Sequence, residues 1–478
     1  MKPDKKAMTS FLLSGFSLII MIEEKQIVEN KLAHAPVIKL LWEYSIPSIV
    51  GTMVMSLYNV IDRIFIGQGV GPLAISGLAL TFPFMNFLMA FGMLIGVGAA
   101  ARISISLGQN DHVKANKIIA NAAMLTLLVS GAVIIFAMIF KTDILMLFGG
   151  SEQTVVYANQ FMSIIIPATL ISTFGFSFNN IMRASGYPKK AMLTMFIGAG
   201  VNVVLAPIFI FGFNWGIRGA AWATAISMTV SCFWVMSHFF KKSSIVHFEK
   251  KHFIFDKQII KSILGIGMSP FSMQIAMSAI IIITNLSLIK YGGDLAVGAY
   301  GIFSAITMLI VMFIIGINQG AQPILGYNYG AKLYDRMFQA LKLSAYAATF
   351  ITFLGFIAGT FFSHQIVSIF TTDKHLQDLA AEGLRISVTI FPLVGAMIVF
   401  SNFFQSIGKA KIAMFLSLTR QVLFLIPFLF ILPPVFGLDG VWYAMPASDS
   451  LACIVTSATL IFFIKKFKKE NTLNTQKV

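Results

Sequence analysis

Residues 45–67 read SIPSIVGTMVMSLYNVIDRIFIG, and the interpretation of the whole chain starts from them. The run is long enough to cross a bilayer, because ~20 helical residues at ~1.5 Å each cover the hydrocarbon core. It contains one carboxylate, Asp62, and one proline, Pro47. A carboxylate in a spanning helix is costly unless it faces a protein interior or a water-filled cavity. We therefore expect Asp62 to bind a proton or another cation.

The composition places the whole chain in a membrane. Of its 478 residues, 57% are hydrophobic and 11% are charged, whereas soluble proteins have ~25% charged residues. The formal charge of +16 could indicate nucleic acid, but no basic–aromatic module interrupts the apolar runs, so we expect no such partner. Cys232 and Cys453 lie in apolar runs and predict neither a disulfide framework nor a metal site. We expect no cofactor other than a coupling ion.

Hydrophobic runs alternate with short polar loops and predict twelve transmembrane helices. These are expected at residues 42–66, 74–101, 117–140, 156–182, 191–213, 219–240, 262–289, 295–321, 340–363, 382–406, 412–432 and 438–464. Every second loop is basic. The basic loops carry Lys114 and Lys117; Arg183, Lys189 and Lys190; the lysines of residues 241–261; Lys332 and Arg336; and Lys409 and Lys411. The positive-inside rule then puts both termini in the cytoplasm. We expect the membrane to be a bacterial inner membrane.

The two halves of the chain repeat each other at an offset of 222 residues. The matches include Leu73 with Leu295, Gly98 with Gly320, Gly108 with Gly330, Asn180 with Asn402, and Gly186 with Gly408. Six helices in each half make the copies parallel in the membrane. We expect an all-α polytopic protein divided into an N-terminal extension and cytoplasmic segment (1–40), an N-lobe (41–240), a linker (241–261), a C-lobe (262–464) and a basic tail (465–478). Met21 is a second plausible start, and we assign residues 1–20 no function. A surface-lying amphipathic helix is expected at residues 253–263.

Several stretches resemble the MATE (multidrug and toxic compound extrusion) family over nearly the whole chain. They are YNVIDRIFIG (58–67), GVGAAARISISLGQND (96–111), NNIMRASGYPKKAM (179–192), GINQGAQPILGYNYGAK (316–332), QSIGKAKIAMFLSLTRQ (405–421) and FGLDGVWYAMPASD (436–449). The match is closest to the bacterial branch with a single acid in the first helix. The resemblance implies two six-helix lobes around a central cavity. It also implies a secondary antiporter that couples inward H+ or Na+ flow to efflux of organic cations.

The resemblance also assigns site residues. Asp62 matches the essential first-helix aspartate of the family, and the alternative is an interfacial pair with Arg63. Asn202 and Thr224 match further polar positions, with interhelical packing as the alternative. The family motif Asn-x-x-x-Asp-Pro has Ala206 in place of its aspartate here, which removes one negative charge and favours protons over sodium.

The spacing of Pro47 from Asp62 also matches the family, whose first helix bends with ion state, although such a proline can also serve packing alone. Asn285 stands at the repeat position of Asp62, at the offset of 223 residues that also relates Pro47 to Pro270, so we expect the two lobes to be functionally unequal.

Two further groups of polar residues fall within predicted helices. Arg420 and Asp449 are both expected near mid-membrane, where they would form a structural pair or, alternatively, a second proton relay. A candidate substrate cavity needs apolar walls and a few polar anchors. The candidate anchors are Asn180, Gln274, Asn285, Asn318, Gln319 and Gln322.

Other classes of function fit the sequence less well. No HExxH, GxSxG or Walker A motif appears in the sequence, so we expect no enzyme. The remaining alternative is an exporter of a lipid-linked or polysaccharide precursor, which would want a basic cavity for phosphate. Because one chain supplies both lobes, a monomer would suffice.

Overall fold

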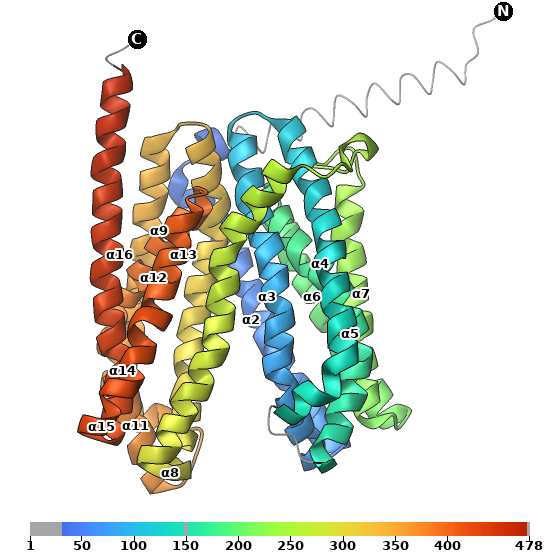
Figure 1. The fold of residues 1–478 in the computed structure, drawn as a ribbon, viewed down its shortest axis with the longest axis vertical. Coiled ribbons are helices and arrows are strands. Elements are labelled where there is room, and N and C mark those ends of the chain that lie inside the picture. Colours follow the sequence, from blue (N-terminus) through green and yellow to red (C-terminus); the bar gives the residue numbers. More distant parts are fainter. Residues whose placement is uncertain (1–30, 148–151, 476–478) are drawn as a thin grey trace, which may run out of the picture.

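The computed structural model describes residues 31–147 and 152–475, and every regular element in this part of the chain is helical (Figure 1). The expected extension at residues 1–20 and the alternative start at Met21 lie outside the described residues. The N-lobe contains α2 (Val37–Gly69), α3 (Pro72–Gly108), α4 (His112–Leu147), α5 (Glu152–Ala184), α6 (Pro188–Pro207), the π-helical turn η1 (Ile208–Gly212) and α7 (Gly216–Phe239). A linker with one 3-10 turn, η2 (Lys250–His252), follows.

The C-lobe begins with α8 (Lys257–Gly330), whose backbone is non-helical at Gly293, so it crosses the membrane twice. The other C-lobe elements are α9 (Tyr334–Phe361), α10 (Ser363–Ser368), α11 (Lys374–Val388), α12 (Phe391–Ser406), α13 (Ala410–Leu418), the π-helical turn η3 (Thr419–Leu425), α14 (Ile426–Ile431), α15 (Pro433–Phe436) and α16 (Leu438–Thr475). The break in α8 needs a glycine, because φ is +68° at Gly293.

The helices confirm the twelve predicted spans. In the described part of the chain, ten helices are long and apolar enough to cross a membrane, and α11 with α12 forms one more span bent by 54°. Counting α8 twice gives twelve. The protein is thus an all-α polytopic membrane protein of two lobes, which stand side by side in Figure 1.

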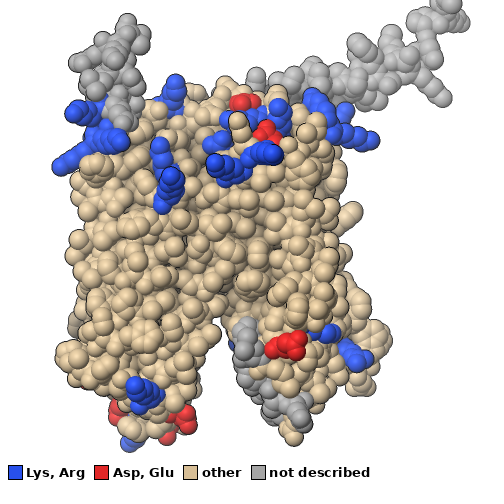
Figure 2. All heavy atoms as spheres, viewed as in Figure 1, with Lys and Arg blue, Asp and Glu red and all other residues tan. Residues whose placement is uncertain are grey.

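The hydrophobic cores show where the lobes join. One large cluster contains buried residues of both lobes, such as Ile103 of α3 and Ile263 of α8. Each lobe also has a core of its own, which contains Phe161 in the N-lobe and Trp442 in the C-lobe. In the described part of the chain the lobes therefore share apolar packing at one end of the molecule, which we call the joined end. Figure 2 shows a deep notch between them at the other end.

Glycines permit the close approach of the lobes at the shared core. A Cβ atom added to Gly98 would lie 2.1 Å from the carbonyl oxygen of Ile263 at the start of α8. A Cβ atom added to Gly320 would lie 2.6 Å from the Cα atom of Ser45 in α2. Gly98 and Gly320 are related by the internal repeat, so a glycine permits close backbone packing at two places in the lobe interface.

Both described ends of the chain lie at the joined end of the molecule. Arg336, near the start of α9, donates hydrogen bonds to the carbonyl oxygens of Leu32 and Ala35, at 3.3 and 2.6 Å. Phe467, near the end of α16, packs edge-on against Tyr334 with ring centroids 4.7 Å apart. Lysines and arginines crowd the surface at this end, opposite the notch (Figure 2).

The linker is bound to the N-lobe rather than free. The side-chain amide of Asn116 in α4 donates to Glu249 at 2.8 Å, and its oxygen accepts from the His247 backbone at 3.1 Å. Hydrogen bonding from Lys251 holds the pKa of Glu249 below its ordinary value. Residues 253–256 are not helical and α8 begins at Lys257, so the expectation of a separate surface helix over 253–263 is wrong. The hydrophobic residues at the start of that stretch belong to a non-helical segment.

Candidate functional site

Asp62 is a buried carboxylate in the N-lobe. It lies in α2, seven residues before the helix ends at Gly69, and only 8% of its surface is exposed. Its Oδ1 atom is buried and has no hydrogen-bond partner among the described residues. Ile66, one turn after Asp62, and Ala206 of α6 both belong to the apolar core of the N-lobe. A charged oxygen in this environment needs a proton, a cation or water to satisfy it.

Arg63 does not pair with Asp62. Its side chain is exposed, and its guanidinium carbon lies 5.4 Å from the centre of the Phe82 ring. Within the described residues no ion pair joins Arg63 and Asp62. Adjacent residues of a helix point ~100° apart, which explains why the arginine faces outward while the carboxylate faces the core.

A chain of polar side chains runs from Asp62 to α6 and α7. The phenol of Tyr58, one turn before Asp62, lies within electrostatic reach of the carboxylate and close to the Thr224 side chain. Asn202 of α6 donates from Nδ2 to Thr224 Oγ1 of α7 at 3.1 Å. The Oδ1 atom of Asn202 is buried without a partner in the described structure. The structure therefore brings Asn202 and Thr224 into contact, and Tyr58 lies between this pair and Asp62.

The arrangement provides oxygen atoms with unused lone pairs. Protonation would satisfy the Asp62 carboxyl, and a small cation could be held by carboxylate, hydroxyl and amide oxygens together. Ala206, one turn after Asn202, is fully buried and packs in the N-lobe core. Among the described residues this site therefore offers one carboxylate, because Ala206 stands in place of a second acid, as the sequence predicted. The part of the chain that the structure covers holds no cluster of three or more His, Cys, Asp or Glu suited to a metal ion.

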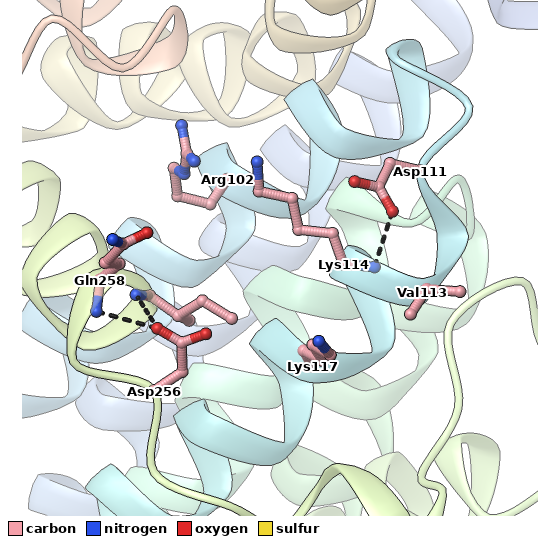
Figure 3. Close-up of a pocket in the computed structure, with 8 residues that line it drawn as sticks. Arg102, Asp111, Val113, Lys114, Lys117, Asp256 and Gln258 are labelled. Carbon is pink, nitrogen blue, oxygen red and sulfur yellow. Dashed lines mark hydrogen bonds between the residues drawn. The ribbon is translucent and has the colours of Figure 1, made fainter.

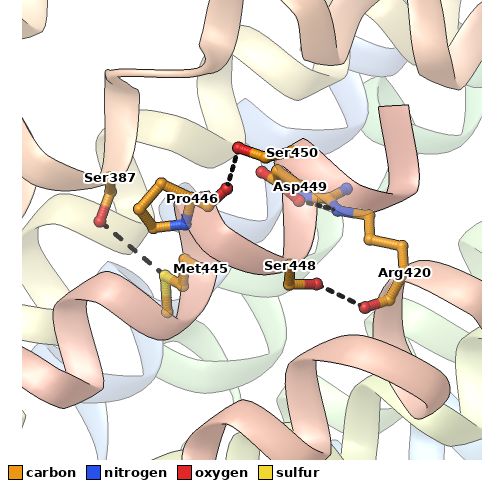
Figure 4. A network of polar contacts seen from close by, with 7 residues as sticks. All are labelled: Ser387, Arg420, Met445, Pro446, Ser448, Asp449 and Ser450. Atoms are coloured by element: carbon orange, nitrogen blue, oxygen red, sulfur yellow. Dashed lines mark hydrogen bonds and ion pairs between the residues drawn. The ribbon is translucent and has the colours of Figure 1, made fainter. Parts of the chain in front are cut away.

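The second charged group, Arg420 and Asp449, forms an ion pair in the C-lobe (Figure 4). Arg420 lies in the π-helical turn η3 and donates from Nε to Asp449 Oδ1 at 2.5 Å and from Nη2 to Oδ2 at 3.3 Å. Asp449 is 4% exposed. Ser448 donates to the backbone oxygen of Arg420 at 2.6 Å. This carboxylate is thus neutralised by its own lobe.

The residues predicted to line a substrate cavity are dispersed. Asn318, Gln319 and Gln322 lie in the second half of α8, at the joined end, in a stretch whose apolar residues belong to the shared core. Gln322 donates to the backbone of Val97 at 3.5 Å. Asn402 donates to the backbone of Asn318 at 3.3 Å. These contacts join helices at the closed end of the molecule.

The remaining three candidates lie elsewhere. Asn180 donates to the Phe176 backbone within α5 at 2.9 Å. Gln274 and Asn285 are half-buried in the first half of α8. Pro47 is buried inside α2, fifteen residues before Asp62.

Sequence reasoning missed Arg183 as a buried contact between the lobes. The loop charges predict that Arg183 lies in a basic loop. In the structure it lies in the last turn of α5 and is 4% exposed. It donates to Gln319 of the C-lobe at 2.5 Å and to Asn179 one turn earlier at 3.0 Å. The i, i+4 spacing of Asn179 and Arg183 was the available signal.

Known proteins resemble this chain over most of its length. The profile of the MatE family matches residues 47–208 and 271–431, one segment in each lobe. The multidrug export protein MepA of Staphylococcus aureus (strain MRSA252) is 29% identical, with 90% of this chain and 95% of that protein covered. MepA of Staphylococcus haemolyticus is 27% identical with the same coverage.

Solved structures agree in fold. The MATE multidrug transporter DinF-BH is 36% identical, with a TM-score of 0.83 over 90% of this chain and 96% of that chain. A MATE structure in the bent conformation is 25% identical, with a TM-score of 0.87 over 94% of this chain and 99% of that chain.

Proposed function

Because the chain belongs to the MATE family of multidrug efflux transporters, we propose that it exports small organic cations in exchange for protons that bind Asp62. The observation that carries this proposal is the buried Asp62 oxygen without a partner in the described structure, in a lobe whose surrounding core is apolar. No ion pair among the described residues neutralises it, so its charge can change in each transport cycle.

The orientation in the membrane follows from charge. We assign the lysine-rich joined end to the cytoplasm and the notch to the outside, which places both termini in the cytoplasm of a bacterial inner membrane. In this arrangement Asp62 lies in the half of the N-lobe that has its own core and does not share packing with the C-lobe. A proton from outside would then reach Asp62 while the lobes are apart.

The exchange can be derived from the charge of one carboxylate. A charged Asp62 favours a cationic substrate in the space between the lobes, and a protonated Asp62 removes that attraction. Protonation from outside would therefore release the cargo. Rocking of the two lobes would then expose the site to the other side.

Protons are favoured over sodium by the single carboxylate. Sodium needs several oxygen ligands, and a second carboxylate among them would bind the ion more tightly because it adds a negative charge. The position that carries this acid in the family motif is Ala206, which is buried in the core. The polar oxygens of Asn202 and Thr224 remain, so both ions must be tested.

The cargo is proposed from the chemistry of the site and from the relatives. An acidic site suits a cation, whereas a lipid-linked or polysaccharide precursor would need positive charge for its phosphate groups. The curated relatives are named multidrug export proteins, and the solved relative DinF-BH is named a multidrug transporter. Ethidium, a planar organic cation whose fluorescence reports its movement, is therefore a suitable first probe.

The test is efflux of ethidium from proteoliposomes that contain the wild type, Asp62→Asn or a control. Asp294→Asn is a matched control, because Asp294 is an exposed carboxylate. We expect the wild type and the control to transport ethidium on a pH gradient without sodium and Asp62→Asn to lose this transport. Transport driven by sodium alone would show that Ala206 does not select protons. If neither gradient moves ethidium or a second organic cation, tetraphenylphosphonium, the assignment of cationic cargo is wrong.

A further inference from the structure

A cavity of about 290 Å³ lies at the joined end of the molecule, between the end of α3, the start of α4 and the start of α8 (Figure 3). Three cationic side chains line it, namely Arg102, Lys114 and Lys117. Two carboxylates, Asp111 and Asp256, also line it. The elements that form it belong to the N-lobe and to the first turn of the C-lobe.

The two carboxylates are engaged by the backbone. Asp111 Oδ1 accepts a hydrogen bond from the Lys114 backbone at 2.9 Å. Asp256 Oδ1 accepts from the backbone of Gln258 and Ile259, at 2.9 and 3.1 Å, and caps α8. Figure 3 shows these bonds as dashed lines. Both acids therefore act as helix caps.

The cations lack a counter-charge of their own. Throughout residues 31–147 and 152–475, no ion pair within 4.0 Å joins Arg102, Lys114 or Lys117 to a carboxylate. The Arg102 side chain is half-buried, and no described residue accepts a hydrogen bond from it. A partly buried guanidinium is well suited to the oxygens of a phosphate group, which it can bind with two parallel hydrogen bonds.

An apolar segment borders the cavity. Phe253, Ile254 and Phe255 directly precede Asp256, and their exposed fractions are 43%, 72% and 53%. Asn121 of α4 holds this segment in place, because it donates to the Ile254 backbone at 3.2 Å and accepts from the Asp256 backbone at 2.9 Å. Three consecutive large apolar residues exposed on a fixed backbone are typical of contact with a bilayer surface. Their position favours a lipid over a free phosphate ion.

We propose that this cavity binds the headgroup of an anionic phospholipid, with Arg102, Lys114 and Lys117 around the phosphodiester. The acyl chains then run beside Phe253, Ile254 and Phe255. Basic pockets between membrane helices bind acidic headgroups by the same electrostatic principle. Since the lining comes from α3, α4 and the start of α8, the bound lipid ties the first turn of the C-lobe to the N-lobe.

The experiment measures lipid binding to the purified full chain in detergent. Phosphatidylglycerol, phosphatidylcholine and inorganic phosphate are added separately, and the unfolding temperature and the lipid retained in native mass spectrometry are recorded. The cavity variant is Arg102→Gln/Lys114→Gln. The matched control Lys189→Gln/Lys465→Gln removes the same charge from exposed lysines outside the cavity.

We expect phosphatidylglycerol to raise the unfolding temperature of the wild type and the control, and phosphatidylcholine to have no such effect. The cavity variant should bind phosphatidylglycerol about 30-fold more weakly, because two cations near the headgroup are lost. A second variant, Lys114→Gln/Lys117→Gln, keeps the half-buried Arg102 and serves if the first does not fold.

Three outcomes would overturn the proposal. Equal binding of phosphatidylglycerol by the cavity variants and the control would place the lipid elsewhere. An equal effect of inorganic phosphate would show that the cavity takes a soluble anion and that lipid is the wrong source. Equal retention of phosphatidylcholine would show that the cations do not select the headgroup.

Discussion

The two lobes treat a buried carboxylate in opposite ways. In the N-lobe, Asp62 has a buried oxygen that no described residue satisfies, and its neighbour Arg63 points away. In the C-lobe, Asp449 is bound by both nitrogens of an arginine fork from Arg420. The repeat position of Asp62 is occupied by Asn285, so the C-lobe acid is a separate feature and not a copy.

We therefore propose different roles for the two carboxylates, one in holding the fold together and the other in exchanging a proton. A carboxylate whose charge is balanced locally is held in one state, and its removal disturbs the fold. A carboxylate whose charge is left unbalanced can exchange its proton, and its removal costs little packing. The asymmetry thus predicts that changes in the two lobes have different consequences.

The largest effect is expected from breaking the C-lobe pair. Arg420→Met leaves Asp449 buried without a partner and should lower the free energy of unfolding by about 3–5 kcal/mol. The double variant Arg420→Met/Asp449→Leu should recover most of this loss. Asp62→Asn should leave the free energy of unfolding near that of the wild type. Denaturant unfolding in detergent measures all three, and an equal loss for Asp62→Asn would contradict the comparison.

A smaller effect is expected where the lobes meet through Arg183 and Gln319. Arg183→Met removes charge-assisted hydrogen bonds of about 1.5–3 kcal/mol, so the joined end should open more often. The measure is labelling by a polar maleimide of one cysteine placed at Asn318, after Cys232 and Cys453 are replaced by Ala. Lys189→Met, at an exposed position in the next helix, is the control and should not change the labelling rate. An unchanged rate for Arg183→Met would show that this contact does not hold the lobes together.

Sequence was sufficient for the arrangement of helices and for part of the site. Hydrophobic length and loop charge identify spans because the bilayer imposes both, and the repeat revealed Gly98 and Gly320 before their contacts were visible. Arg183 was missed because a cation near a span end normally marks a loop. Its pairing with Gln319 depends on two helices far apart in sequence. Tyr58 was missed for the same reason, since Thr224, which lies close to it, is on α7.

Gly98 and Gly320 are related by the internal repeat, and each lies where one lobe contacts the other. Replacing each glycine in turn tests whether the two contacts contribute equally to transport. Gly98→Ala and Gly320→Ala each place a Cβ atom against backbone, so each should weaken closure by about 1–3 kcal/mol. Gly131→Ala is the matched control, because nothing lies within 4 Å of its added Cβ atom. The measure is the initial rate of ethidium efflux, which we expect to fall in both interface variants and not in the control. A fall in only one would mean that the two contacts close in different steps.

The smallest effect is expected at Thr224 in the N-lobe. It distinguishes a role of Asn202 and Thr224 in ion coupling from a contact that only packs α6 against α7. Thr224→Val removes the acceptor for Asn202 and should lower the free energy of unfolding by about 1 kcal/mol, because the buried amide loses its partner. Thr352→Val is the control in the C-lobe, since that buried hydroxyl bonds only to carbonyls of its own helix. If Thr224 serves ion coupling, its replacement also slows proton-driven ethidium efflux, whereas the Thr352 variant transports at the wild-type rate. Equal transport by both variants would make Asn202 and Thr224 a packing contact and leave Asp62 to act without them.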